Sequence, residues 1–148
     1  MKNRIILSVV FAALFFCSAC SGPKTEVLVI GGSASGVAAG IQSARLGAKT
    51  IILEEHLWLG GMLTSAGVSA VDGNYRMPAG IFGEFRDSLV AHYGSLGALA
   101  TGWVSNVLFE PSVGARIYKN MAAREPNLTV QYELSLIHIS EPTRRRGI

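Results

Sequence analysis

Residues 25–55 read TEVLVIGGSASGVAAGIQSARLGAKTIILEE, and their pattern predicts the fold. The continuous apolar run at 27–30 predicts a parallel strand, because a strand covered on both faces shows no polar alternation. A glycine-rich turn follows, and helical spacing then predicts a helix over 34–46 that ends before Gly47. Residues 50–53 predict a second strand. This order of elements indicates an α/β, Rossmann-like dinucleotide-binding fold with a parallel sheet.

The turn has the features of a dinucleotide site. Gly31 permits a tight exit from the strand, and Gly36 lets the helix pack closely, with its N–H groups facing a pyrophosphate. Glu54 ends the second strand, where an acid accepts hydrogen bonds from the adenosine ribose. Ser33 stands where G-x-G-x-x-G has its middle glycine: its Cβ narrows the approach to the phosphates, or its hydroxyl donates to one. The candidate residues here are Gly31, Gly32, Ser33, Ala34, Ser35, Gly36, Glu54 and Glu55.

A second glycine pair follows the acidic residues in HLWLGGMLTSAG, residues 56–67. With VLVIGGSASG, ILEE and LGGMLTSAG, the chain resembles the FAD-dependent oxidoreductases of the glutathione-reductase-like group, which have two dinucleotide folds. Within that group it is most similar to a family of bacterial exported FAD-dependent oxidoreductases, over most of residues 26–133. The resemblance implies FAD as the cofactor. It also implies cofactor contacts from Gly60, Gly61, Met62, Thr64 and, through the backbone beside the adenine, Val130.

The function implied by this resemblance is hydride transfer between an organic substrate and the flavin. The substrate class is small-molecule or carbohydrate-like, and neither the electron acceptor nor a catalytic residue is assigned. Three alternatives stay open. An NAD(P)-dependent dehydrogenase would share residues 31–54 without needing the second glycine pair. A flavin and iron–sulfur electron-transfer relative would need cysteine clusters elsewhere. A non-enzymatic envelope binding module would keep the fold without the cofactor.

Downstream segments read as core and sheet elements. Ile81, Phe85 and Leu89 recur one helical turn apart, which predicts a packed helix. Residues 111–125 predict a second helix that begins with proline and carries one apolar stripe. Residues 127–133 alternate as a strand and are expected to return to the sheet.

The N-terminus, MKNRIILSVVFAALFFCSAC, predicts export. A charged start, a short apolar run and small residues describe a signal peptide over residues 1–19, and CSAC resembles a bacterial lipobox with Cys20 as the lipidated residue. We expect a lipoprotein of the cell envelope, facing the periplasm or in the outer membrane and held to the membrane by its lipid. Cys17 and Cys20 are the only cysteines, so the mature chain has no thiolate ligands for an iron–sulfur cluster.

The last residues, 134–148, read LSLIHISEPTRRRGI and differ from the rest. Residues 134–144 resemble the in-frame translation of a transposase-type sequencing adapter, which predicts read-through rather than native chain. The native part, residues 20–133, is then the N-terminal part of an FAD-binding domain and is expected to be inactive alone. It holds eight Lys/Arg and nine Asp/Glu, a net charge of −1, with no basic patch for nucleic acid. No metal-ligand cluster stands out.

Overall fold

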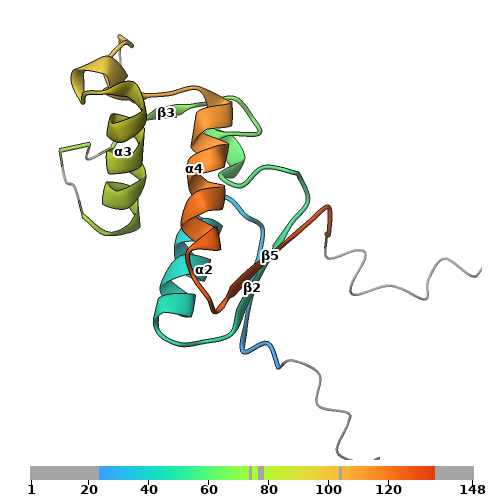
Figure 1. Ribbon diagram of the computed structural model, residues 1–148. Helices are drawn as coiled ribbons and strands as arrows, with labels where there is room; N and C mark the ends of the chain where they lie inside the picture. Colours follow the sequence, from blue (N-terminus) through green and yellow to red (C-terminus); the bar gives the residue numbers. More distant parts are fainter. Residues whose placement is uncertain (1–23, 74, 77–78, 104, 136–148) are drawn as a thin grey trace, which may run out of the picture.

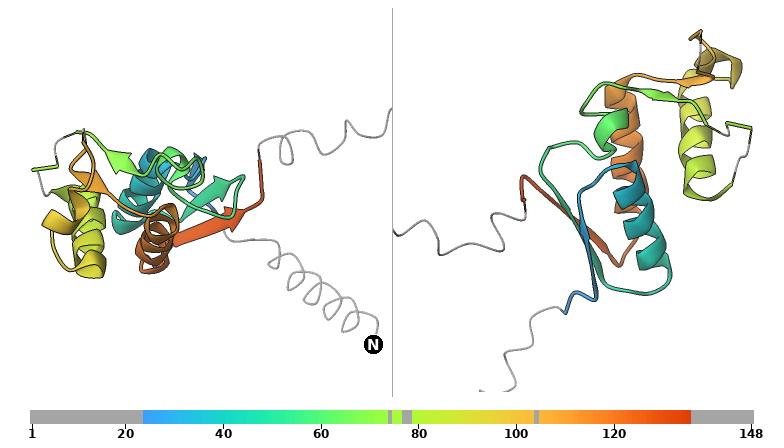
Figure 2. Two further views of the ribbon diagram at one scale, coloured as in Figure 1. Left: turned by 90° about the horizontal axis from the view of Figure 1, so that it is seen from above. Right: turned by 180° about the vertical axis from the view of Figure 1, so that it is seen from behind.

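The computed structural model of the protein describes residues 24–73, 75–76, 79–103 and 105–135 (Figure 1). The predicted signal peptide, Cys20 and residues 136–148 lie outside these ranges. The described chain forms a three-stranded sheet, two helices packed against it, and a smaller group of elements beside the second helix (Figure 2).

The sheet consists of β1 (Val27–Ile30), β2 (Thr50–Glu54) and β5 (Leu128–Tyr132). β2 lies in the middle and pairs in parallel with both neighbours, so that Thr50 stands opposite both Val27 and Leu128. The carboxyl ends of all three strands therefore meet at one end of the sheet, where ligands bind in open α/β folds. The parallel sheet confirms the predicted α/β class, and β5 confirms the strand predicted at its position.

Helices α2 (Ala34–Arg45) and α4 (Pro111–Ala123) pack on one face of this sheet (Figure 1). The buried side chains of Val37 in α2 and Ile52 in β2 belong to one core. Gly40 permits this close packing, because a Cβ at Gly40 would lie 2.5 Å from Cδ1 of Ile52. Both helices confirm their predictions, with α2 ending one residue earlier than expected and α4 two.

The opposite face of the sheet is covered by no helix among the described residues. Leu28 and Ile30 of β1 are 51% and 48% exposed, and Thr129 and Gln131 of β5 are exposed as well. β1 is also an edge strand, since β2 is its one partner in the described sheet. The sequence predicts cover on both faces of β1. The described structure differs because both helices that contact the sheet pack on the same face.

The smaller group of elements confirms the helix predicted around Phe85 and adds a pair of short antiparallel strands that was not predicted. It consists of β3 (Ala70–Val71), α3 (Gly80–Tyr93), the 3₁₀ turn η2 (Gly97–Leu99) and β4 (Val107–Leu108). Strands β3 and β4 pair antiparallel. The ring of Phe85 stacks on Tyr118 of α4, with centroids 4.2 Å apart, and meets Phe109 edge-on at 5.3 Å. These contacts dock α3 onto α4.

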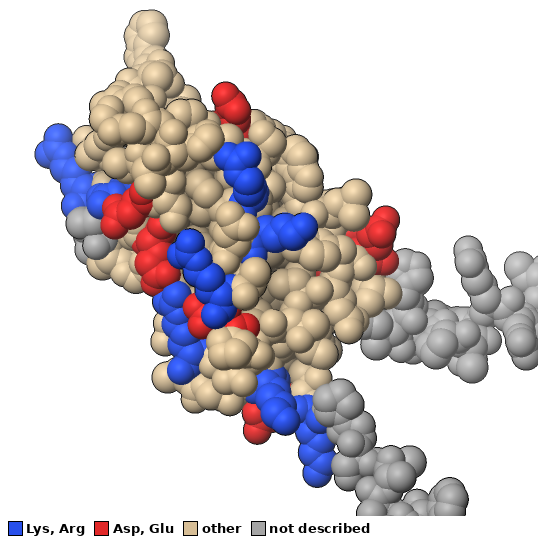
Figure 3. All heavy atoms as spheres, in the orientation of Figure 1, with Lys and Arg blue, Asp and Glu red and all other residues tan. Residues whose placement is uncertain are grey.

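An arginine fork also ties three elements together. Arg45, at the end of α2, contacts Glu84 of α3 at 2.6 Å and Glu125, after α4, at 2.8 Å. The hydrogen bonds from Arg45 lower the pKa of Glu84, and both partners raise the pKa of Arg45. Acidic and basic side chains are interspersed over the face drawn in Figure 3, so this described surface is not an extended basic patch.

Candidate functional site

The glycine turn after β1 has the conformation that its sequence predicts. Gly31 has φ +89°, in the left-handed region that favours glycine, and its N–H donates to the carbonyl of Leu53 at 2.8 Å. No atom lies within 4 Å of a Cβ built on Gly31, so this part of the turn faces open space. Ser33 caps α2 by accepting from the N–H of Gly36 at 3.3 Å, and its hydroxyl lies 3.0 Å from that of Ser35. The start of α2 therefore gathers N–H groups and two hydroxyls, a favourable place for an anion.

Gly36 seats the helix on the turn itself. A Cβ at Gly36 would overlap the carbonyl oxygen of Gly31 and would lie 3.5 Å from Cγ1 of Val29. Close packing on the sheet was the predicted role. The turn restricts Gly36 more than the sheet does, because the carbonyl group of Gly31 belongs to the backbone and cannot rotate away from a new Cβ as a side chain could.

Glu54, at the end of β2, is joined to the turn by hydrogen bonds. Its Oε2 accepts from the N–H of Gly32 at 2.6 Å, and its Oε1 accepts from the N–H of His56 at 2.9 Å. Only 6% of the residue is exposed. Burial, together with the charge of Glu54, raises the pKa of Tyr132 across the strand pair. The predicted ribose acceptor thus lies at the turn, and backbone N–H groups already engage both of its oxygens.

The second glycine pair lies directly beside this turn. The N–H of Gly60 donates to the carbonyl of Gly32 at 2.7 Å, and Gly60 forms a parallel bridge with Ser33. Gly60 and Gly61 have φ of +112° and +54°. A Cβ on Gly61 would lie 3.1 Å from Cα and 3.2 Å from Cβ of Ser33. Two glycine-rich segments far apart in the sequence therefore form one continuous cradle.

The cradle borders a pocket of about 370 Å³ at the carboxyl ends of β1 and β2. One side of the pocket is closed by Leu134, the first residue of the predicted adapter segment, whose backbone N–H donates to the carbonyl of Glu54 at 3.1 Å. The pocket is lined by Ile30, Gly31, Ser33, Leu53, Glu54, Glu55, His56, Gly61, Ser65, Ala66, Leu134 and Ser135. The wall therefore includes five predicted cofactor-binding residues, which are Gly31, Ser33, Glu54, Glu55 and Gly61.

The other predicted residues lie behind or beside this wall. Gly32 lies in the turn after β1, Gly60 lies beside it in the second glycine pair, and Ala34, Ser35 and Gly36 begin α2. Met62, in the 3₁₀ turn η1 (Gly61–Leu63), is 66% exposed.

Thr64 and Val130 face away from the pocket. Thr64 is 1% exposed, and its hydroxyl donates to the carbonyl of Leu59 at 2.7 Å, so it braces the loop from inside. The side chain of Val130 packs against the core, on the helix-covered face with Ile52. Their predicted contacts with FAD therefore stay predictions.

Leu59 is a contributor that sequence reasoning missed. It is fully buried, and a Cβ on Gly32 would lie 2.5 Å from its Cδ2. Leu59 therefore forms the floor beneath the turn. A leucine directly before the glycine pair was the available signal, since an apolar residue at that point has to bury itself under the loop. The backbone N–H of His56 was missed as well, because a sequence pattern does not display backbone donors.

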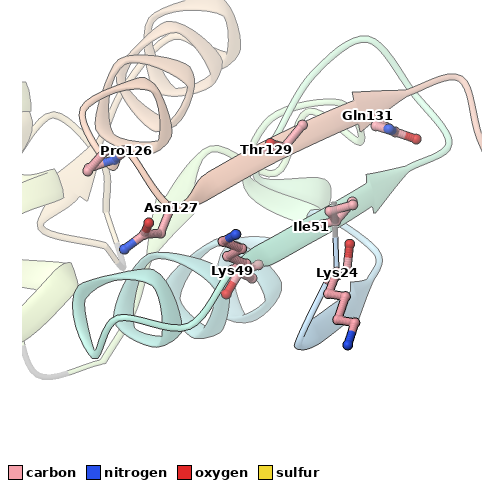
Figure 4. Close-up of a pocket in the computed structure, with 9 residues that line it drawn as sticks. Lys24, Lys49, Ile51, Pro126, Asn127, Thr129 and Gln131 are labelled. Carbon is pink, nitrogen blue, oxygen red and sulfur yellow. The ribbon is translucent and has the colours of Figure 1, made fainter. Parts of the chain in front are cut away.

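A second pocket, of about 360 Å³, lies on the open sheet face at the amino ends of β2 and β5 (Figure 4). Its lining residues are Lys24, Thr25, Lys49, Thr50, Ile51, Pro126, Asn127, Thr129 and Gln131. None of them is a predicted site residue. Ligands of open α/β sheets bind beyond the carboxyl ends of the strands, so the pocket at the cradle is the better candidate.

The cradle fits a dinucleotide by the chemistry of its donors. Backbone N–H groups and the hydroxyls of Ser33 and Ser35 suit a pyrophosphate, and the buried carboxylate of Glu54 suits ribose hydroxyls. A side chain on Gly36 would overlap the turn after β1, and a side chain on Gly61 would press on Ser33, so glycine suits both positions. Among the described residues, no three His, Cys, Asp or Glu side chains gather as a metal site.

Comparison with known proteins agrees with this chemistry. The chain matches the family described as FAD dependent oxidoreductase over residues 26–147, a range that includes most of the predicted adapter segment. No curated protein matches. THI4 of Thermovibrio ammonificans is a similar solved structure, with 19% identity and a TM-score of 0.43 over 87% of this chain and 45% of that one.

A second similar structure is p-nitrophenol 4-monooxygenase PnpA of Pseudomonas putida DLL-E4. It has 15% identity and a TM-score of 0.40, over 72% of this chain and 31% of that one. The chain thus spans less than half the length of either structure. The family match covers most of the chain and favours FAD over the nicotinamide alternative. The protein therefore belongs to the FAD dependent oxidoreductase family.

Proposed function

We propose that this chain is the FAD-binding front part of an exported oxidoreductase. When bound, the flavin supplies the hydride chemistry, and the protein supplies position and electrostatics. The observation that carries the proposal is the cradle, in which the turn after β1, the acid ending β2 and the second glycine pair meet at one pocket. The substrate is a small organic or carbohydrate-like molecule.

Each part of the cradle has a role in this proposal. The start of α2 holds the pyrophosphate, with the Ser33 hydroxyl as an added donor that its position on the pocket wall supports. Glu54 receives the adenosine ribose. Gly61 keeps the ribitol side of the pocket open, because a side chain there would press on Ser33.

A substitution that preserves the helix cap tests the site. Ser33→Asp keeps an acceptor for the Gly36 N–H, since aspartate caps helices as well as serine does. It also places a negative charge where the pyrophosphate is proposed to lie. We expect the FAD dissociation constant to rise about tenfold or more, as two like charges about 4 Å apart near a protein surface repel each other by over 1 kcal/mol. Titration with FAD, followed by flavin fluorescence, measures it.

The matched control is Ser95→Asp. The hydroxyl of Ser95 likewise accepts from a backbone N–H, that of Ala98 at 3.2 Å, but Ser95 does not line the pocket. This variant is expected to bind FAD as the unchanged chain does. Equal affinity in both variants would contradict the proposed site. Bound nicotinamide nucleotide with no flavin absorption would contradict the proposed cofactor.

We also propose that the protein is a bacterial envelope lipoprotein anchored through Cys20. Support comes from the charged and apolar N-terminus and its lipobox-like end. Among the described helices, none is both long and apolar enough to cross a membrane. Cys20→Ser should move the protein from the membrane fraction to the soluble periplasmic fraction. Unchanged membrane association would contradict the anchor.

Residues 134–148 are proposed to be adapter-derived, on the resemblance of residues 134–144 to the translated adapter. Sequencing the genomic reading frame across this junction directly, without amplification or added adapters of this type, tests it. A native frame should diverge directly after Glu133 and continue into further strands of the FAD-binding domain. Recovery of LSLIHISEPTR from unamplified genomic DNA would overturn the proposal.

A further inference from the structure

We infer that Glu54 is a positioning residue that holds the glycine turn in its binding conformation before any cofactor arrives. The inference goes beyond the ribose contact proposed for this carboxylate. Its meaning for binding rests on the proposed function, while its test does not require the cofactor.

The two oxygens of the Glu54 carboxylate join two separate segments. Oε2 accepts from Gly32, in the turn after β1, and Oε1 accepts from His56, in the loop after β2. The distances are 2.6 and 2.9 Å, in the range of charge-assisted hydrogen bonds. Because Glu54 is buried, water competes little for these donors. The carboxylate therefore acts as a clamp between the two loops.

The clamp acts at the most adaptable point of the turn. Glycine populates many backbone conformations, so an unrestrained Gly32 would let the following peptides reorient. In the structure its N–H is held by Glu54 and its carbonyl by the N–H of Gly60. Both peptide groups flanking Gly32 are thereby fixed, and the direction of the Ser33 peptide at the start of α2 is set with them. Such preorganisation lowers the entropy lost when a ligand binds.

Amide hydrogen exchange on the full chain without FAD tests the clamp. In Glu54→Ala, the amides of Gly32 and His56 should exchange about tenfold faster or more, the effect typical of losing a hydrogen bond to a charged group. In Glu54→Gln, one of these two amides should keep its protection, because a carboxamide has one acceptor oxygen. Ile117, buried in α4, reports whether the fold is intact and should be unchanged.

Glu55→Gln is the matched control, since Glu55 lies on the same pocket wall but is exposed. It should leave the exchange of both amides as in the unchanged chain. If Glu54→Ala also removes protection at Ile117, that variant no longer has an intact fold, and the test then rests on the exchange of Gly32 and His56 in Glu54→Gln. Unchanged exchange at both Gly32 and His56 in Glu54→Gln would overturn the inference, even if FAD affinity fell, because the carboxylate would then act on the ligand alone.

The same samples keep the two proposals apart. Failure of the unchanged chain to take up FAD, with faster exchange in Glu54→Ala, would count against the proposed cofactor site and would leave the clamp supported. FAD binding by the unchanged chain, with no change in exchange in Glu54→Ala, would support the cofactor site and contradict the clamp.

Discussion

For Gly40→Ala, helix propensity and core packing predict opposite changes in the free energy of unfolding. Alanine is favoured over glycine in a helix by up to about 1 kcal/mol, so propensity alone predicts a more stable protein. In the structure, however, the new Cβ would lie 2.5 Å from Cδ1 and 2.8 Å from Cγ1 of Ile52, and 3.4 Å from Cδ1 of Leu128. Carbon atoms prefer separations of about 3.5–4.0 Å, so α2 and β2 would have to part by about 1 Å.

The expected result is a net loss of stability. Ile52 is fully buried, and inserting a methyl group into a packed core costs about 1–3 kcal/mol. After the gain from propensity, Gly40→Ala should lower the free energy of unfolding by about 1–2 kcal/mol. Urea denaturation followed by circular dichroism measures it. Ala39→Gly, at the neighbouring exposed position, calibrates the propensity difference in the same helix.

A double mutant isolates the contact. Ile52→Val deletes Cδ1, the atom nearest the new methyl group, and should cost about 1 kcal/mol in the unchanged chain. In the Gly40→Ala background it should cost less or become stabilising, with a coupling energy of about 1 kcal/mol. Stability in Gly40→Ala equal to or above that of the unchanged chain, or additive effects in the double mutant, would refute the packing argument.

Three further outcomes are expected. Gly61→Ala should weaken FAD binding and cost about 1–2 kcal/mol of stability, because alanine disfavours the left-handed φ of this position and its Cβ would lie 3.2 Å from Cβ of Ser33. Ser33→Gly removes the second of these two causes and should restore part of the stability. Arg45 lowers the pKa of Glu84, so the contribution of Glu84 to the free energy of unfolding is full above pH 4.5 and disappears as pH falls through the lowered pKa. Glu84→Gln should therefore lose less stability than the unchanged chain when the pH is lowered. Burial raises the pKa of Tyr118 to about 12, so its contribution, full below pH 10, disappears as pH rises towards 12, and Tyr118→Phe should remove that loss.

Denaturation over a pH series checks the last two, and FAD titration with denaturation checks the first. No recovery in the Gly61→Ala, Ser33→Gly double mutant would show that the Ser33 contact is unimportant. An unchanged acid profile in Glu84→Gln would show that the arginine fork does not stabilise the fold. A Tyr118 that ionises near pH 10 in an ultraviolet titration would show that its ring is accessible to water.

The unit around the cofactor cradle could be read from the sequence because its determinants are local. The apolar run, the glycines and the acid of residues 27–54 follow one another in the order in which the elements form. The positive φ of Gly31 and the serine cap of α2 require no distant partner. The helices were predictable for the same reason, since Phe85 and the stripe of α4 repeat at helical spacing.

The features that could not be predicted from the sequence depend on how distant segments pair and pack. Val130 was predicted to contact the adenine through its backbone, which stays a prediction; that its side chain packs on the helix-covered face follows from its pairing opposite Ile52, which the sequence does not show. Thr64 has the hydroxyl of a ligand-binding residue, but the carbonyl that it bonds is fixed by how the loop folds. The strands β3 and β4 have two residues each, which is too short for any alternation to be visible.

The residues of the Glu54 clamp and the glycine turn lie close together in the sequence. The two hydrogen bonds of Glu54 and the bond from Gly60 to Gly32 all join residues between Gly32 and Gly60, whereas β5 reaches β2 from more than seventy residues further along the chain. A short contiguous gene segment therefore encodes the whole clamp and turn. Recombination could move that segment between proteins without breaking its internal contacts. The later segments, including α3 and the strands β3 and β4, supply none of the hydrogen bonds of the Glu54 clamp and can diverge without breaking them.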